Sequence, residues 1–215
     1  SKLLDTGFSV EPGRALTVNH VAKRINAFVG DDTTVIAETG DSIFLAADLV
    51  MTHDVGFIGQ AFYLSIGYAL PATLGAALAD PSRRPVTFIG DGAFQMTAQE
   101  LSSLCRRQSN AIILLLNNDG YTTERVIHEG PYNDIQPWDY HKLPEVYGGG
   151  WGQRVRTEDE LEDALNTARA TNNGPALIEI MLDRFDTSDA LKRLGEALSP
   201  DRRDRDEEKR GPQPV

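Results

Sequence analysis

The sequence has one cysteine, Cys105, in 215 residues. A single thiol cannot form an internal disulfide, so we expect folding to be independent of an oxidising compartment. Cys105 follows Leu101 and Leu104 in a predicted helix, a position typical of a buried and unreactive thiol. The cysteine is therefore assigned to the core and not to catalysis.

Long apolar runs are also missing. No stretch approaches the roughly 18 consecutive apolar residues of a membrane span, and the residues from Ser1 onward lack the pattern of a secretory signal. The hydrophobic content of 40% and the charged content of 25% are typical of a globular domain with a buried core. We expect a soluble, cytoplasmic protein without a membrane partner.

Positive charge is scarce, with 21 Lys and Arg against 32 Asp and Glu and a formal net charge of −11. A negatively charged surface disfavours binding to nucleic acid or anionic lipid, so neither is expected as a partner. A polyanionic ligand would have to be held locally, by backbone N–H groups, a cation or both.

Apolar residues alternate between helical and strand spacing through most of the chain. Helical spacing predicts helices over residues 16–29, 63–78, 97–107, 157 to before 174, and from 186 or 187 to about 198. Runs of Ile, Leu and Val predict buried strands over residues 33–37, 86–89, 111–116 and 176–182. This alternation indicates an open, doubly wound α/β fold, with a mainly parallel sheet and helices on both faces.

Capping residues mark three of the predicted helix starts. Thr97 with Glu100 has the form of a capping box, and Thr157 with Glu160 repeats it. Asp186 or Thr187 can cap the last helix.

The predicted domain spans residues 15–198. Residues 1–14 contain glycine and proline without periodicity, which is typical of a linker remnant that arrives from an upstream segment. Residues 199–215 are nearly all charged, proline or glycine, which predicts a disordered charged tail.

Polar loops that follow three predicted strands are candidates for a binding site, because open α/β sheets bind ligands at the carboxyl ends of their strands. These loops cover residues 38–42, 90–92 and 117–121. Asp91 and Asn118 are separated by one helix and one strand, so they lie on adjacent loops and can converge on one ion. A carboxylate, an amide oxygen and a loop carbonyl suit Mg²⁺ that takes its remaining ligands from a diphosphate and water.

The sequence Gly-Asp-Gly is a weak signal by itself, because glycines beside an aspartate suit any tight turn. In the diphosphate interpretation, Gly90 and Gly92 let the backbone approach a phosphate, and N–H groups at the start of the next helix supply dipoles for an anion. Competing nucleotide motifs are missing, since the chain contains neither G-x-G-x-x-G at this loop nor G-x-x-x-x-G-K-[ST]. The dinucleotide and NTP-hydrolase interpretations lose their main support.

Together, the GDG and NND motifs resemble the magnesium and diphosphate motif of thiamine-diphosphate enzymes. Neighbouring segments look like successive stretches of the pyruvate, phenylpyruvate and indolepyruvate decarboxylase family: AETGDS, LSIGYALPATLGAAL, IGDGAFQMTAQEL, LLNNDGYTTERVIHEGPYNDIQPWDY and GPALIEI. The similarity runs in order from about residue 15 to residue 198. It implies the C-terminal, diphosphate-binding domain of a 2-oxo acid decarboxylase, with thiamine diphosphate and Mg²⁺ as cofactors.

The resemblance also implies a set of cofactor contacts. Mg²⁺ would be held by Asp91, Asn118 and the carbonyl of Gly120. The residues expected to contact the cofactor are Thr39, Asp41, Leu64, Ile66, Asp91, Gly92, Ala93, Asn118, Gly120, Tyr121 and Thr122. From the residues alone, Thr39 and Asp41 could equally cap the short helix that follows them.

Glu124 matches the active-site glutamate of the family, and Thr123 and Ile127 match residues that flank the substrate pocket. An apolar pocket favours a protonated carboxyl group, which suits proton transfer to the reacting carbon after CO₂ leaves. From the residues alone, a glutamate in the first turn of a helix is most often a favourable partner of the helix dipole. His128 lies beyond the matched catalytic position and is assigned a structural role.

Some positions near the cofactor depart from the family pattern. Ile66 matches the aliphatic residue that wedges beneath the cofactor, although without the family it would be assigned to the core. Two residues earlier, where glycine is common, stands Leu64, and Ala93 replaces a frequent serine. Neither change removes a backbone interaction, but both leave open an altered cofactor geometry.

The largest departure concerns length. Family members carry upstream a pyrimidine-binding domain, with the glutamate that activates the cofactor and a pair of adjacent histidines, and then a middle domain. None of the four histidines in this sequence is adjacent to another. We expect a fragment of a longer enzyme or one subunit of a split enzyme, in a homo- or hetero-oligomer that takes a 2-oxo acid as substrate. Such a chain would be inactive without a pyrimidine-binding partner, and the alternative is a non-catalytic module that binds thiamine diphosphate or assembles with a partner.

Overall fold

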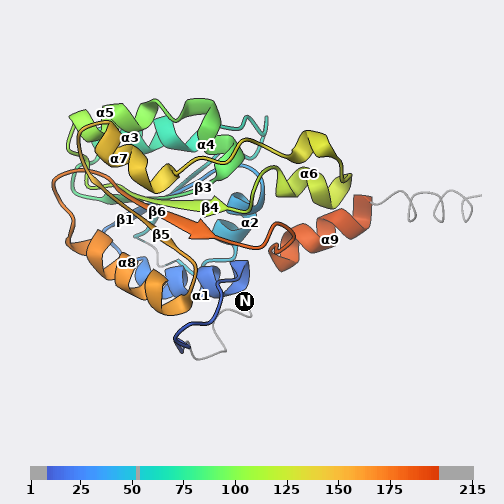
Figure 1. Cartoon of the computed structure of the whole chain (residues 1–215). Helices are drawn as coiled ribbons and strands as arrows, with labels where there is room; N and C mark the ends of the chain where they lie inside the picture. The colour runs from blue at the N-terminus through green and yellow to red at the C-terminus, as the bar shows by residue number, and fades with distance from the viewer. Residues whose placement is uncertain (1–8, 52–53, 199–215) are drawn as a thin grey trace, which may run out of the picture.

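The computed structural model describes residues 9–51 and 54–198, which form a parallel sheet with helices on both faces (Figure 1). The strand order is β2-β1-β3-β4-β6-β5, and every neighbouring pair is parallel. The strands are β1 (Thr33–Ala37), β2 (Gly56–Gly59), β3 (Arg84–Gly90), β4 (Ile112–Asn117), β5 (Trp151–Val155) and β6 (Ala176–Met181). The predicted doubly wound α/β fold is confirmed. Most of the predicted linker and the whole predicted tail, 199–215, lie outside the described residues.

Helices cover the two faces of the sheet as separate layers (Figure 1). One layer consists of α1 (Val18–Phe28), α2 (Asp41–Ala47) and α8 (Glu158–Ala170). The other consists of α3 (Ala69–Ala79), α4 (Asp91–Thr97), α5 (Glu100–Arg106) and α7 (Leu143–Val146). Alternate strand residues face opposite layers, so Leu114 packs into the first core and Leu115 into the second. Cys105 is a buried free thiol in the second core, as predicted.

The strands that the sequence did not predict, β2 and β5, lie at the two edges of the sheet. Residues of β2 alternate between partly buried and exposed, and most of β5 is only partly buried. Each also contains glycine, which weakens the strand signal. Edge strands therefore lack the aliphatic runs that identify the central four.

One of the two predicted capping boxes is confirmed. Thr157 and Glu160 form the reciprocal capping box at the start of α8. The box at Thr97 and Glu100 is wrong, because Thr97 is the last residue of α4 and α5 begins at Glu100. The Thr97 hydroxyl instead donates to the carbonyl of Gly67 at 2.8 Å. A break between two short helices replaces the single helix predicted over residues 97–107.

The helix predicted over residues 63–78 begins later, at Ala69. Leu64 has φ 54° and Gly67 has φ 89°, values that a right-handed helix cannot contain. Residues 63–68 therefore form an irregular segment that leads into α3.

The cap predicted for the last helix, α9 (Asp189–Leu198), is also wrong. Ser188 caps this helix, since its Oγ accepts a hydrogen bond from the N–H of Leu191 at 3.1 Å. Asp186 accepts from the N–H of Val18 at 2.7 Å and so binds the start of α1 instead. Among the described helices, none is both long and apolar enough to span a bilayer.

Candidate thiamine-diphosphate site

The loops after β1, β3 and β4 meet at the carboxyl edge of the sheet, as predicted, around a cavity of about 350 Å³. Helices α6 (Thr122–Ile127) and α9 also line the cavity, α9 through Leu194 and Leu198. All residues predicted for the site lie along it: Thr39, Asp41, Leu64, Ile66, Asp91, Gly92, Ala93, Asn118, Gly120, Tyr121, Thr122, Thr123, Glu124 and Ile127. The fold thus brings together residues that are far apart in the sequence.

Asp91 links two of these loops. It begins α4 directly after β3, and its side chain is almost completely buried. Oδ1 accepts a hydrogen bond from the N–H of Gly92 at 2.8 Å, and Oδ2 accepts from the N–H of Gly120 at 2.9 Å. Burial raises the pKa of Asp91 to about 7, and the two N–H groups offset part of that effect. A buried carboxylate of this kind is a natural partner for a cation.

Oxygen atoms are the donors that this region offers to a metal. Asn118 is buried and lines the same cavity as Asp91. The Gly120 carbonyl accepts from the N–H of Thr122 at 3.0 Å, which leaves it a second lone pair. Within the described ranges, no cluster of three or more His, Cys, Asp or Glu could hold a metal ion. One carboxylate, one amide and one carbonyl fit Mg²⁺ that completes its shell with phosphate and water.

Gly90 and Gly92 differ in the space that surrounds them. A Cβ on Gly92 would lie 2.5 Å from the ring of Tyr121, so this glycine makes room for a side chain of the protein itself. Its N–H group is already bound by Asp91. A Cβ on Gly90 would meet nothing within 4 Å, so packing inside the described chain does not require glycine there. Both glycines line the cavity, and their close approach to a ligand stays a prediction.

Asp41 binds another part of the chain. Its carboxylate accepts hydrogen bonds from the N–H of Ser188, at 2.8 Å, and from the Ser188 hydroxyl. Helix α2 has Gly40 at its N-cap and no capping side chain, so the alternative that Thr39 or Asp41 caps it is wrong. Burial raises the pKa of Asp41 above its ordinary value. Asp41 therefore joins α2 to the start of α9 at the wall of the cavity.

Glu38 is a residue that the sequence interpretation missed. It lies at the end of β1, is completely buried, and accepts from the N–H groups of Thr39 at 3.0 Å and Ala69 at 2.9 Å. Burial raises its pKa. Its carboxylate thereby fixes the start of α3 and the end of the segment that carries Leu64 and Ile66. A charged residue directly after a buried apolar strand was the available signal.

Leu64 adopts the left-handed conformation that glycine tolerates best, with φ 54°. This geometry gives a physical reason for the glycine that is common at this position in the resembling family. The Leu64 side chain is 58% exposed and Ile66 is 44% exposed, so both lie at the open side of the cavity. The interpretation of Ile66 as a core residue is excluded.

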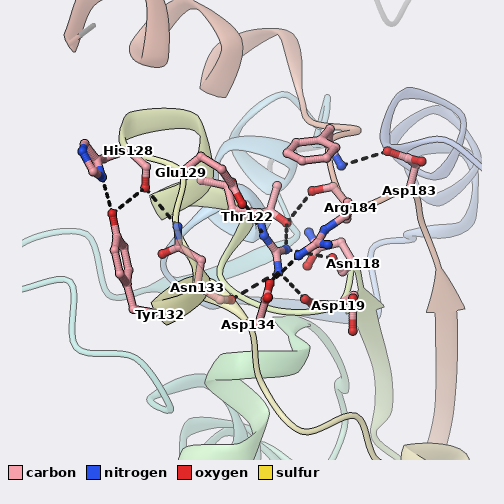
Figure 2. Close-up of polar contacts among 12 residues, drawn as sticks. Asn118, Asp119, Thr122, His128, Glu129, Tyr132, Asn133, Asp134, Asp183 and Arg184 are labelled. Carbon is pink, nitrogen blue, oxygen red and sulfur yellow. Dashed lines mark hydrogen bonds and ion pairs between the residues drawn. The ribbon is translucent and has the colours of Figure 1, made fainter. Parts of the chain in front are cut away.

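Glu124 lies in the first turn of α6 and is exposed. The apolar enclosure expected around it is not formed by the described parts of the chain. Thr122 anchors the same turn, because its hydroxyl donates to the carbonyl of Arg184 at 3.0 Å. His128 lies outside the cavity lining and forms a hydrogen bond with the Tyr132 hydroxyl (Figure 2).

A parallel α/β sheet with a cavity at the carboxyl ends of its strands defines the class of open α/β domains that bind ligands at that edge. Residues 38–180 match the family of the thiamine pyrophosphate enzyme C-terminal TPP binding domain. The chain belongs to this family, and its resemblance to the pyruvate decarboxylases is confirmed.

Two similar proteins are pyruvate decarboxylases of greater length. The chain is 42% identical over 194 residues to "Pyruvate decarboxylase 4" of Arabidopsis thaliana and 43% identical over 194 residues to "Pyruvate decarboxylase 1" of Oryza sativa subsp. indica. Both alignments cover 88% of this chain and 32% of the relative, so the chain spans about a third of the length of these relatives.

Solved structures share the fold. The thiamine diphosphate-dependent 4-hydroxybenzoylformate decarboxylase of Rhodococcus jostii superposes with a TM-score of 0.73 at 28% identity, over 86% of this chain and 36% of that one. The benzoylformate decarboxylase of Polynucleobacter necessarius superposes with a TM-score of 0.69 at 22% identity, over 77% of this chain and 33% of that one, which demonstrates a common fold alone.

Proposed function

We propose that this chain supplies the diphosphate- and magnesium-binding half of a non-oxidative 2-oxo acid decarboxylase. The observation that carries the proposal is the Asp91 carboxylate, buried between two loops and held by the N–H groups of Gly92 and Gly120. Asp91 lines one cavity together with Asn118 and Gly120, at the carboxyl edge of the sheet. Such a donor set suits Mg²⁺ bound to a diphosphate.

Mg²⁺ would be held by Asp91, Asn118 and the Gly120 carbonyl. Burial destabilises the ionised form of Asp91, and a bound cation would offset this destabilisation. The double positive charge of Mg²⁺ would also neutralise part of the negative charge of a diphosphate. The protein has a net charge of −11, so its overall charge cannot attract such an anion.

The cofactor would occupy the cavity between the three loops. Thiamine diphosphate supplies the carbanion chemistry of decarboxylation when it is bound. The open space at Gly90 would admit its phosphates, and Ile66, exposed at the cavity edge, would support its rings. Thr39, Ala93 and Tyr121 line the same cavity and would complete the contacts.

Glu124 is proposed as the catalytic proton donor, with Thr123 and Ile127 on the wall of the substrate pocket. All three project from α6, which begins directly after the proposed metal loop. The short connection fixes the position of Glu124 relative to Asn118 and Gly120. Proton transfer at the reacting carbon requires that kind of fixed distance from the cofactor.

A pyrimidine-binding domain from a partner would close the site. Glu124, Leu64 and Ile66 are exposed although they line the cavity, and the preceding residues Phe62 and Tyr63 are 84% and 79% exposed. Apolar side chains gathered at one edge commonly mark an interaction surface. The 2-oxo acid, the oligomeric assembly and the cytoplasmic location remain predictions from the sequence.

The test of this proposal is turnover with and without the partner. The chain alone, given pyruvate or phenylpyruvate with thiamine diphosphate and Mg²⁺, should form no aldehyde above background. Native protein purified with its associated chains should form aldehyde, and Glu124→Gln in that complex should abolish most of it. Sustained turnover by the chain alone would contradict the division of the site between two domains.

A non-catalytic module is the second candidate, favoured by one observation. Leu64 places a bulky side chain, with strained left-handed backbone, at the cavity where glycine is common. A module of this kind would bind thiamine diphosphate in its native assembly without producing aldehyde from either 2-oxo acid. The same assay therefore separates the two candidates.

A further inference from the structure

The buried guanidinium group of Arg125 lies against the backbone of the proposed metal loop. Arg125 follows Glu124 on α6, and its side chain is 0% exposed. We propose that Arg125 is a positioning residue, which holds the loop at Asn118 to Gly120 in the conformation that binds Mg²⁺. This inference rests on the proposed function, because it assigns a device for the same site.

Arg125 donates to two consecutive carbonyls of the loop. Nη1 donates to the carbonyl of Asn118 at 3.2 Å, and Nη2 donates to the carbonyl of Asp119. Nη2 also donates to the carbonyl of Asn133 at 3.3 Å and to the carboxylate of Asp134 at 2.8 Å. Figure 2 shows these acceptor residues gathered around one point from two different segments. A planar guanidinium can satisfy such divergent acceptors together, which an ammonium group cannot.

The peptide between Asp119 and Gly120 is held at both ends. Its N–H group donates to Oδ2 of Asp91 at 2.9 Å, and its carbonyl accepts from Arg125. Two opposed hydrogen bonds fix the plane of one peptide, and the Gly120 carbonyl follows directly along the chain. The orientation of that proposed metal ligand is therefore set by Asp91 on one side and by Arg125 on the other.

Gly120 packs closely against the same group. It has φ 124°, and an added Cβ would lie 2.8 Å from Nη2 of Arg125 and would overlap the carbonyl of Asn133. The loop is thus closed over the guanidinium without space for a side chain.

The charge of Arg125 is balanced outside the cavity. Asp134 pairs with Arg125 and also with Arg184, which lies on the segment after β6 (Figure 2). Glu129 lies 4.0 Å from Nε of Arg125. With these carboxylates as its partners, Arg125 can order the loop while Asp91 keeps its oxygens for the N–H groups and a cation.

Mg²⁺ titrations of thiamine diphosphate binding to the 215-residue chain test the role of Arg125. Arg125→Met should raise the half-saturating Mg²⁺ concentration about 10- to 100-fold, the range for residues that orient metal ligands. Excess Mg²⁺ should restore the affinity for thiamine diphosphate, because the cofactor contacts themselves are intact. Arg125→Lys retains the charge but loses the planar guanidinium group, so its half-saturating Mg²⁺ concentration should lie between those of wild type and Arg125→Met. This variant replaces Arg125→Met in the test if the methionine variant does not fold.

Arg184→Met is the matched control, because Arg184 shares Asp134 with Arg125, whereas in the described part of the chain its side chain has no hydrogen bond to the metal loop. It should leave the half-saturating concentration unchanged. In the cofactor-free chain, amide exchange of Gly120 should be faster in Arg125→Met than in wild type or Arg184→Met, while exchange of Leu114 in β4 stays the same.

The outcomes separate this inference from the proposed function. A wild-type chain that binds thiamine diphosphate independently of Mg²⁺ overturns the proposed metal site. A Mg²⁺-dependent wild type whose Arg125→Met variant folds and keeps the same half-saturating concentration overturns only the role of Arg125. Faster amide exchange at Gly120 without any change in the half-saturating Mg²⁺ concentration would mean that Arg125 only stabilises the loop. That result would also overturn the proposed positioning role.

Discussion

The N–H of Gly120 donates to Oδ2 of Asp91 at 2.9 Å, which joins the loop after β4 to the loop after β3. The other oxygen of Asp91 accepts from Gly92 in its own loop. Because β3 and β4 are adjacent parallel strands, this one carboxylate fixes two neighbouring strand ends relative to each other. The proposed cation site is therefore partly formed by the protein before any ligand binds.

The raised pKa of Asp91 predicts that the free energy of unfolding of the metal-free chain falls as pH rises. Burial raises the folded-state pKa from 3.8 to about 7, so the folded state holds the proton more tightly than the unfolded state. The resulting stabilisation is complete below about pH 4 and is lost as pH rises through about 7. The loss is at most about 4 kcal/mol. Urea denaturation in a chelator, from about pH 5 to 8, measures it.

Two variants control for the source of this pH dependence. Asp91→Asn removes the titrating group and should make the profile shallower, whereas Asp163→Asn changes an exposed carboxylate on α8, away from the cavity, and should leave the profile as in wild type. Above pH 7, added Mg²⁺ should stabilise wild type but not Asp91→Asn. Identical profiles for wild type and Asp91→Asn would refute the assignment.

The left-handed conformation of Leu64 predicts that glycine stabilises the chain at this position. The left-handed conformation destabilises the fold by roughly 1–2 kcal/mol when the residue is not glycine. Replacement by glycine removes this strain, but glycine also loses more conformational entropy on folding, which offsets part of the stabilisation. Because the Leu64 side chain is largely exposed, Leu64→Gly should raise the free energy of unfolding by roughly 0.5–1 kcal/mol. Ser65→Gly, at a residue without positive φ, should instead lower it. Destabilisation by Leu64→Gly would mean that the side chain contributes more through packing than the backbone costs.

Substrate size should depend on Thr123. Family members confined to pyruvate often carry isoleucine next to the catalytic glutamate, and Thr123 is smaller, so the complete enzyme should accept branched or aromatic 2-oxo acids as well as pyruvate. Thr123→Ile should lower the ratio of kcat/KM for phenylpyruvate to kcat/KM for pyruvate by about 10- to 200-fold, which corresponds to roughly 1–3 kcal/mol. An unchanged ratio, or rejection of phenylpyruvate by both forms, would exclude Thr123 as the wall of the pocket.

The central sheet and the cavity could be predicted from the sequence because their signals are local. The aliphatic run of β4 identifies a buried strand, and the polar residues directly after it, including Asn118, lie at the strand end in any parallel sheet. Asp91 and Glu124 follow from the same rule and from the family resemblance. The lining of the cavity contains every one of the predicted positions.

The remaining features depend on contacts between distant segments. Nothing near Asp41 in the sequence indicates Ser188, which binds its carboxylate. Likewise, Arg125 looks like an ordinary exposed helical residue until Asn133 and Asp134 fold back over it. Local capping rules also failed at Thr97, where a hydrogen bond to Gly67 took the place of a helix start.

The central claim is that a divalent cation at Asp91 holds thiamine diphosphate. Calorimetric titration of thiamine diphosphate into the 215-residue chain tests it most directly, with Mg²⁺, with excess chelator, and with Asp91→Ala beside Asp163→Ala, an exposed control on α8. We predict binding that requires Mg²⁺, is lost in Asp91→Ala and persists in Asp163→Ala. Equal affinity in chelator, or in Asp91→Ala, would contradict it.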